Sequence, residues 1–173
     1  MSGADGLAAG LFERHGRSLR QYLRALTGSV ELAEDLAQDV FVRVVRSADR
    51  YEPRERERAW LFRIARNAAL DHRRREAVRP AGAGHALEPA TGATQAIRAS
   101  VREALAQLPE VEREAFLMAE LGGLSYAEIA AALDVSVAAV RSCLYRARLT
   151  LRAALPAPSP GGALVTRTDK DHD

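Results

Sequence analysis

Residues 77–97 divide the chain, because this segment (AVRPAGAGHALEPATGATQAI) holds two prolines and three glycines and shows no helical spacing of apolar residues. Such a composition predicts a flexible linker, which we place at 79–96. Two blocks remain, 7–78 and 97–155, and each is long enough for roughly three or four packed helices. The segment 156–173 begins with prolines and glycines and continues with polar residues, so we expect a disordered tail there.

The content of the two blocks favours an all-α protein with two small helical domains. Aromatic residues make up only 5 % of the chain, and no segment shows the residue pattern of a strand. The single cysteine, Cys143, cannot close a disulfide within the chain, and the four histidines lie far apart, so we expect no metal site and no cofactor. No run approaches the roughly 18 apolar residues of a membrane helix, and no secretory signal is recognisable. We therefore expect a cytoplasmic protein without membrane insertion.

Charge is unevenly distributed along the chain, although the net charge is only +2. Segment 54–75 holds eight arginines against three acidic residues, and segment 137–155 holds four arginines and no acidic residue. Segment 30–39 holds four acidic residues and no basic one. The two basic segments predict two anion-binding faces, and the acidic segment predicts a surface for a different kind of partner.

The first block is expected to begin with a helix over 7–26, which Gly28 ends, followed by a helix that Ser29 caps. The outer side of this second helix is acidic around Val42. An apolar residue among acids is either an ordinary exposed valine or the centre of a docking face, and the helix alone favours neither. Its predicted core stripe consists of Val30, Ala33, Leu36, Ala37, Val40, Phe41 and Val44.

A third helix, expected over 60–75, carries an arginine-rich face. Arginines in its last turn are also explained by the negative end of the helix dipole, but Arg63 and Arg66 lie too early for that. Because these two also lack an acid four residues away, we interpret the face as a nucleic-acid-binding surface. It consists of Arg63, Arg66, Asn67, Arg73 and Arg74.

Two further residues of the first block allow specific interpretations. The segment 47–58 is polar and contains Pro53, which predicts a loop. Within it, Tyr51 could equally well stack on a nucleic-acid base or cover the core. Asp71 is interpreted as a partner within its own helix that orients Asn67 and Arg75.

The second block contains the pattern of a helix-turn-helix. A helix starts at Pro109 and stops before Gly123, with Val111, Ala115, Phe116, Met118 and Ala119 as its apolar set. Ser125 and Glu128 then have the spacing of a capping box, and a turn at Asp134 leads to a basic helix. A structural helical hairpin gives a similar pattern, but four arginines without an acid favour a helix that reads the major groove. Its outer face consists of Ala138, Arg141, Ser142, Tyr145 and Arg146.

Taken together, these segments resemble a known family. The sequences AEDLAQDVF (33–41) and WLFRIARNAALDHRRR (60–75), followed by LPEVEREAFLMAELGGLSYAEIAAAL and VRSCLYRARLTLR in the second block, are similar to bacterial RNA polymerase sigma factors of the extracytoplasmic-function (ECF) type, within the sigma-70 family. The resemblance covers 7–78 and 97–155. It implies that the first block is region 2 and the second block is region 4 of such a factor.

The resemblance also implies a partner for each surface. Region 2 of this family binds the β′ clamp helices of core RNA polymerase and melts the −10 promoter element, while region 4 binds the β flap and reads the −35 duplex. An anti-sigma factor is a further expected partner. The core-binding residues would be Asp35, Gln38, Asp39 and Val42. The −10 element would be bound by Tyr51, Arg63, Arg66, Asn67, Arg73 and Arg74, and the −35 element by Ala138, Arg141, Ser142, Tyr145 and Arg146.

Two departures from the family pattern affect the −35 surface. Ala138–Ala139 replaces the usual Gly-Thr, and Cys143 replaces the usual arginine. Losing that hydroxyl and that cation would remove phosphate contacts, so the resemblance does not give the promoter sequence.

Two other functions are weighed against a sigma factor. A stand-alone helix-turn-helix regulator would be a dimer that binds a palindrome unaided. An enzyme is disfavoured, because the sequence shows no paired carboxylates, metal cluster or phosphate-binding glycine loop, and we assign no catalytic residues. The adjacent pair Asp71 and His72 forms no dyad, since neighbouring helical residues point about 100° apart.

Overall fold

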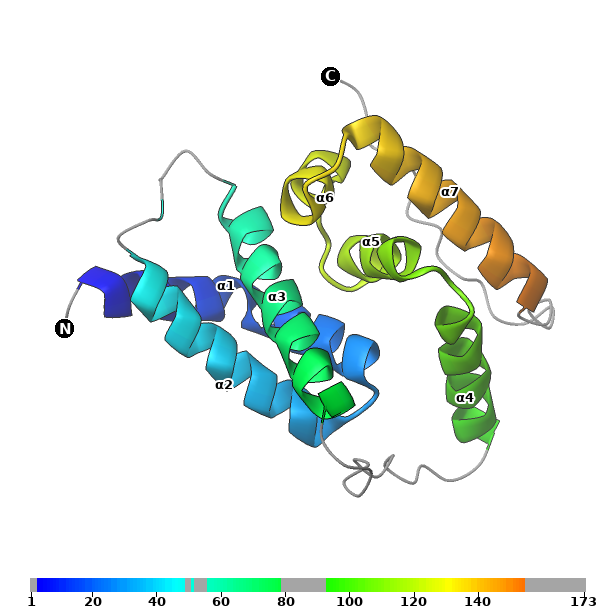
Figure 1. The fold of residues 1–173 in the computed structure, drawn as a ribbon, viewed down its shortest axis with the longest axis horizontal. Coiled ribbons are helices and arrows are strands. Elements are labelled where there is room, and N and C mark those ends of the chain that lie inside the picture. Colours follow the sequence, from blue (N-terminus) through cyan, green and yellow to red (C-terminus); the bar gives the residue numbers. More distant parts are fainter. Residues whose placement is uncertain (1–2, 49–50, 52–55, 79–92, 155–173) are drawn as a thin grey trace.

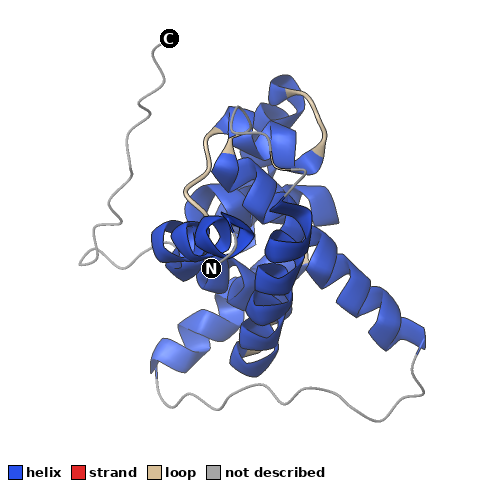
Figure 2. Ribbon diagram, turned by 90° about the vertical axis from the view of Figure 1, so that its left-hand side faces the viewer, coloured by secondary structure: helices blue, strands red, loops and turns tan. Residues whose placement is uncertain are grey.

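The computed structural model describes residues 3–48, 51, 56–78 and 93–154 of the 173-residue chain. Within these ranges it contains seven α-helices and no strand (Figures 1 and 2), which confirms the all-α class. The expected tail at 156–173 and most of the expected linker lie outside the described residues. The helices are α1 (Gly3–Thr27), α2 (Val30–Ser47), α3 (Glu57–Val78), α4 (Ala93–Ala106), α5 (Glu110–Glu120), α6 (Tyr126–Leu133) and α7 (Val137–Ala154).

The helix boundaries in the first block follow from local chemistry. Gly28 has a φ of 75°, a left-handed conformation that ends α1. Ser29 caps α2, since its hydroxyl accepts a hydrogen bond from the Leu32 amide at 3.2 Å. The third helix begins at Glu57, three residues earlier than predicted, and this carboxylate bonds Arg14 and His15 of α1. A tertiary contact and the helix dipole therefore extend α3 beyond its apolar pattern.

The helix-turn-helix is formed by α6 and α7, as predicted. Ser125 and Glu128 make the reciprocal bonds of a capping box at the start of α6. Asp134 follows α6 with φ 56° and ψ 50°, the left-handed turn that the sequence predicts at a position where glycine is more common. The Ser136 hydroxyl accepts a hydrogen bond from the Ala139 amide at 3.1 Å, which caps α7.

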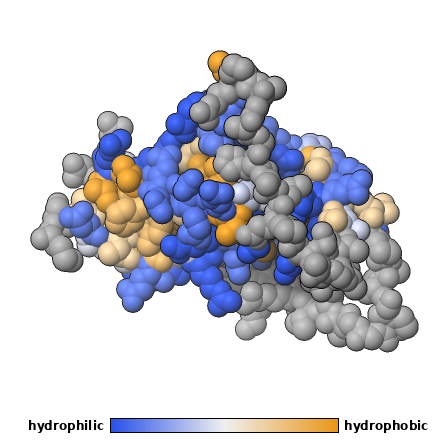
Figure 3. All heavy atoms as spheres, turned by 90° about the horizontal axis from the view of Figure 1, so that it is seen from below, coloured by the Kyte–Doolittle hydropathy of each residue, from blue (hydrophilic) through white to orange (hydrophobic). Residues whose placement is uncertain are grey.

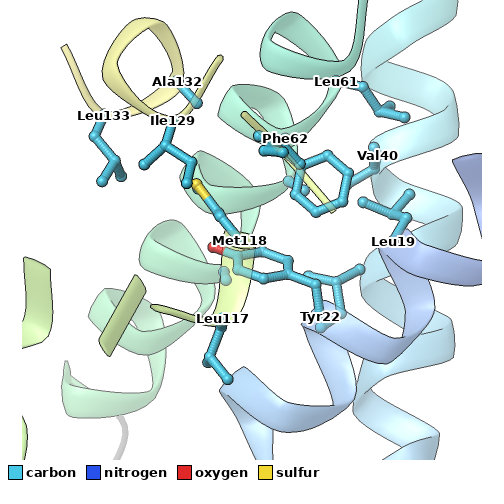
Figure 4. Packing of buried hydrophobic residues seen from close by; sticks show 14 of the residues in the cluster. Leu19, Tyr22, Val40, Leu61, Phe62, Leu117, Met118, Ile129, Ala132 and Leu133 are labelled. Atoms are coloured by element: carbon cyan, nitrogen blue, oxygen red, sulfur yellow. The ribbon is translucent and has the colours of Figure 1, made fainter. Parts of the chain in front are cut away.

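The two helical blocks share one hydrophobic core. Tyr22 of α1 and Phe62 of α3 lie with ring centroids 5.2 Å apart, and both belong to the same buried cluster as Met118 of α5 and Ile129 of α6 (Figure 4). Gly122 fits at this junction because a Cβ there would come within 2.8 Å of a Phe62 ring carbon. As a result, α5 and α6 pack against α1 and α3, and α5 lies between α3 and α7 (Figure 1).

Two residues expected in the core are on the surface instead. Phe41 is 38 % exposed and packs edge-on against Phe12 of α1, with ring centroids 5.3 Å apart. Val111 of α5 is 41 % exposed, while Glu112 and Glu114 of the same helix are buried. The rest of the predicted apolar set of α5 faces the core, with Ala115 and Met118 buried and Phe116 and Ala119 partly buried. The buried face also includes the two acids, because they have partners on other helices.

Candidate nucleic-acid interface

One candidate surface lies on α2 and is acidic with an apolar centre. Asp35 and Gln38 are exposed, and Val42, which lies on the same side of the helix, is 42 % exposed. Asp39 is half-buried and accepts a hydrogen bond from Arg43 at 3.0 Å. Phe41 adds a second exposed apolar side chain that the sequence had placed in the core. We call these five residues (35, 38, 39, 41 and 42) the α2 patch.

The surroundings of the α2 patch are also apolar in part. Figure 3 shows apolar side chains gathered at the end of the molecule where α1 begins and α2 ends, beside a hydrophilic surface. Such a mixture of exposed apolar groups and carboxylates suits a protein partner that offers basic and apolar side chains.

Asp71 does not play the role predicted for it. Its carboxylate accepts a hydrogen bond from Arg43 of α2 at 2.8 Å, and this bond is the main cause of the raised pKa of Arg43. Arg75 bonds the backbone carbonyl of Asp71 instead, at 3.3 Å. Asp71 therefore ties α3 to α2 and orients no residue of its own helix through its carboxylate.

Tyr51 precedes α3 and packs on Trp60, with ring centroids 4.8 Å apart. The tyrosine is half-buried against the shared core, as expected of a residue that covers it. Stacking of Tyr51 on a nucleic-acid base stays a prediction.

Two arginines of the α3 face pair with acids of α5. Four of the five residues of this face, Arg63, Asn67, Arg73 and Arg74, are exposed. Arg66 donates to Glu114 of α5 with a separation of 2.7 Å, and the Arg73 guanidinium contacts Glu110 and Glu114 of the same helix.

The premise that no acid neutralises this face is therefore wrong for Arg66 and Arg73. A helical wheel compares residues of one helix, whereas the neutralising acid Glu114 lies 48 residues after Arg66. No residue near Arg66 in the sequence indicates this pairing.

The outer face of α7 is the second basic surface. Ala138, Arg141 and Ser142 are exposed, and Tyr145 is 65 % exposed. Arg146 donates to Glu112 of α5 at 2.5 Å, a bond that raises the pKa of Arg146. An open groove of about 260 Å³ runs beside these residues and is lined by Tyr126, Arg141, Tyr145, Arg148, Leu149 and Arg152.

Four of these groove residues, Tyr126, Arg148, Leu149 and Arg152, were not predicted as site residues. Tyr126 and Arg148 are linked by a hydrogen bond that raises the pKa of Arg148, and Arg152 adds a third guanidinium to the groove. Their periodic spacing from Arg141 (i+7 and i+11) was a usable sequence signal for Arg148 and Arg152. Cys143, by contrast, is buried, so this departure from the family pattern lies on the inner side of α7.

The described residues contain no group of three or more His, Cys, Asp or Glu side chains that could hold a metal ion. None of the helices in the described ranges is long and apolar enough to cross a membrane.

Comparison with known proteins covers both blocks. The family model for sigma-70 region 2 matches residues 11–79, and the family model for sigma-70 region 4 matches residues 98–151. The RNA polymerase sigma factor CarQ of Myxococcus xanthus is 35 % identical over 156 residues, which cover 87 % of this chain and 90 % of CarQ. The ECF RNA polymerase sigma factor EcfG of Rhodopseudomonas palustris is 35 % identical over 143 residues, covering 80 % of this chain and 79 % of EcfG.

Two solved structures have a similar fold. CnrH, solved in complex with the cytosolic domain of CnrY, superposes with a TM-score of 0.67 at 32 % identity and covers 87 % of this chain and 92 % of its own. The sigma factor RpoE from Bartonella quintana, solved with the anti-sigma factor NepR, has a TM-score of 0.66 at 25 % identity, covering 84 % of this chain and 94 % of its own.

Proposed function

We propose that this chain, which belongs to the sigma-70 family of RNA polymerase sigma factors and to its ECF type, directs core RNA polymerase to promoters by recognising a −35 and a −10 element. Members of this family are transcription initiation factors and not enzymes. The observation that carries the proposal is that matches to region 2 and region 4 occur in this order in one chain. The site of action would be the cytoplasm, where RNA polymerase works.

Docking on the polymerase is assigned to the α2 patch, with the β′ clamp helices as the partner. Its carboxylates and its exposed Val42 support this assignment. The test is co-elution of the purified protein with core RNA polymerase. Asp35→Arg should abolish co-elution, whereas Glu103→Arg, the same change at an exposed acid of α4, should preserve it. Equal behaviour of the two variants would contradict the assignment.

Melting of the −10 element is assigned to the arginine face of α3 and to Tyr51. Opening DNA costs about 1–2 kcal/mol per base-pair step, so cations and a stacking surface that hold the freed strand supply what is needed without a catalyst. Arg63→Ala combined with Arg66→Ala should keep polymerase binding and lose run-off transcription on linear templates. Arg98→Ala with Arg102→Ala, at two exposed arginines of α4, is the matched control. Full run-off activity of the α3 double variant would refute the assignment.

Reading of the −35 element is assigned to the outer face of α7, and binding of the β flap to the same block. Arg141 and Tyr145 are exposed where a base edge or phosphate would meet them. Arg141→Ala should weaken holoenzyme binding to its promoter by about 1–3 kcal/mol if the residue reads a base. A uniform loss on all DNA with a smaller salt dependence would instead assign Arg141 to a phosphate.

An anti-sigma factor is proposed as a further partner, supported by the similarity to RpoE, which was solved with NepR. The alternative of a stand-alone dimeric regulator has no support from the matches, since both blocks match sigma-70 regions. Light scattering on the purified protein distinguishes the two functions by oligomeric state, because a sigma factor is expected to be a monomer. A stand-alone regulator is expected to be a dimer that binds an inverted repeat.

A further inference from the structure

A cluster of three ionisable side chains joins α1 to the first residue of α3, and the proposed function uses none of them. Glu57 begins α3, and its two carboxylate oxygens accept hydrogen bonds from Arg14 of α1, at 3.0 Å from Nε and 2.8 Å from Nη2. The buried His15 places its Nε2 2.8 Å from the same carboxylate. A two-point pairing of a guanidinium with a carboxylate fixes orientation as well as distance, so α1 sets where α3 begins.

The start of α3 is also where Tyr51 is held. The backbone amide of Tyr51 donates a hydrogen bond at 3.1 Å to the carbonyl of Ala48, at the end of α2. Its ring packs on Trp60 with ring centroids 4.8 Å apart and an interplanar angle of 49°. Trp60 lies three residues after Glu57, one turn along the same side of α3. The place of the Tyr51 ring therefore depends on how the first turn of α3 is fixed relative to α2.

Arg14 acts on this arrangement from α1, which packs against both α2 and α3 (Figure 1). Its hydrogen bond to Glu57 is the main cause of its raised pKa, and electrostatic attraction to the Tyr51 hydroxyl group adds a smaller part. Because such attraction weakens with distance, this hydroxyl lies close to the guanidinium. The side chains of Arg14 and Glu57 are 52 % and 34 % exposed, so their pair adds only modestly to stability, and its main effect is to orient.

We propose that Arg14 is a positioning residue for the −10 element: its pairing with Glu57 fixes the start of α3 and so holds Tyr51 where its ring stacks on a base of the opened strand. This inference rests on the proposed function, because it uses the assignment of Tyr51 to the −10 element. Arg14 acts through Tyr51 and does not itself touch DNA. A ring that is already held in place loses less freedom when a base binds to it, which favours the open promoter.

The experiment measures opening of a linear promoter that the wild-type holoenzyme transcribes, as the permanganate reactivity of unpaired thymines around the −10 element. Tyr51→Ala should lower the equilibrium constant of opening about 5- to 150-fold, the range expected for a lost base–aromatic stack. If Tyr51 is in place in about one-fifth of Arg14→Ala molecules, this variant loses about fivefold. Arg17→Ala, at an exposed arginine of α1 that forms no ion pair within the described residues, should match the wild type.

Combining the two substitutions separates positioning from other roles of Arg14. If Arg14 acts through Tyr51, the variant with both Arg14→Ala and Tyr51→Ala should open the promoter as poorly as Tyr51→Ala alone. A general role in the fold, or direct contact with DNA, would make the two losses multiply, and that result would overturn the inference. Equal opening by Arg14→Ala and Arg17→Ala would overturn it as well. Normal opening by Tyr51→Ala would remove both the −10 assignment of Tyr51 and the inference.

A further variant, Arg14→Lys, covers the case that Arg14→Ala disturbs folding, which far-UV circular dichroism detects. Lysine keeps the positive charge but cannot make the two-point pairing with Glu57, so Arg14→Lys should reproduce most of the defect. Wild-type opening by Arg14→Lys would mean that charge alone suffices, against the inference. Each of these failures would leave the sigma-factor function intact, because co-elution and run-off transcription of the wild type with core polymerase test it separately.

Discussion

Met118 offers a direct test of whether the two helical blocks fold as one unit. Its side chain is fully buried in α5 and belongs to a cluster that also contains Tyr22, Phe62 and Ile129. Met118→Ala removes three heavy atoms from a site enclosed by both blocks, and changes of this kind cost about 2–5 kcal/mol of unfolding free energy. With a urea m-value of about 2 kcal/mol/M, the unfolding midpoint should fall by roughly 1–2.5 M.

The assay uses a reporter in the other block. Trp60 in α3 is the only tryptophan of the chain, so its fluorescence reports unfolding of the first block, while far-UV circular dichroism reports all helices. Met118→Ala in the second block should move both transitions together by the stated amount. Leu149→Ala on α7, where the side chain is 47 % exposed, should change the free energy by less than about 0.5 kcal/mol. A Trp60 transition that stays at the wild-type midpoint in Met118→Ala would refute the shared core.

Three smaller perturbations test individual contacts. The Arg14 and His15 hydrogen bonds lower the pKa of Glu57, so its carboxylate stabilises the fold at pH values above the ordinary pKa of glutamate. Glu57→Gln should therefore lower the unfolding free energy at neutral pH, and this difference from the wild type should vanish as the pH falls through the lowered pKa. Urea titrations at a series of pH values from neutral to acid measure the difference. Ser125→Ala should cost about 1 kcal/mol by removing the capping box, read from the urea midpoint. The buried Tyr22 hydroxyl has no hydrogen-bond partner among the described residues, so Tyr22→Phe should keep or raise the melting temperature.

Local features of the fold were predictable because their causes are local. The cap at Ser29, the left-handed turn at Asp134 and the capping box at Ser125 each depend on residues within a few positions of one another. The same holds for most of the core stripe of α2, where five of its expected members are buried. The exposure of Val42 was also predictable from its own helix, because this valine lies on the acidic face opposite the core stripe.

Contacts between helices were not predictable from the sequence. Asp71 was matched with residues of its own helix, yet it bonds Arg43, which lies 28 positions away. Glu112 and Glu114 are not part of the predicted apolar set of α5, yet both are buried because arginines of α7 and α3 neutralise them. From helical periodicity alone, a carboxylate is placed on the surface. A buried carboxylate needs a basic partner on another helix, and which residue becomes that partner depends on how the helices pack.

The pair of Arg66 and Glu114 links the packing of α5 on α3 to the DNA contacts of the proposed function, and the two partners are expected to differ in their effect on DNA binding. Removing one partner leaves the other charge without its counter-charge, so either substitution weakens the packing of α5 on α3. Arg66→Ala also removes a cation that the proposed function gives to the −10 strand, whereas Glu114→Gln leaves every proposed DNA contact in place. When binding of a fluorescent single-stranded oligonucleotide is followed by anisotropy without polymerase, Glu114→Gln should therefore bind more tightly than Arg66→Ala at equal salt. Its affinity should also fall more steeply as salt is added. Equal affinities and equal salt dependence would mean that Arg66 does not contact DNA.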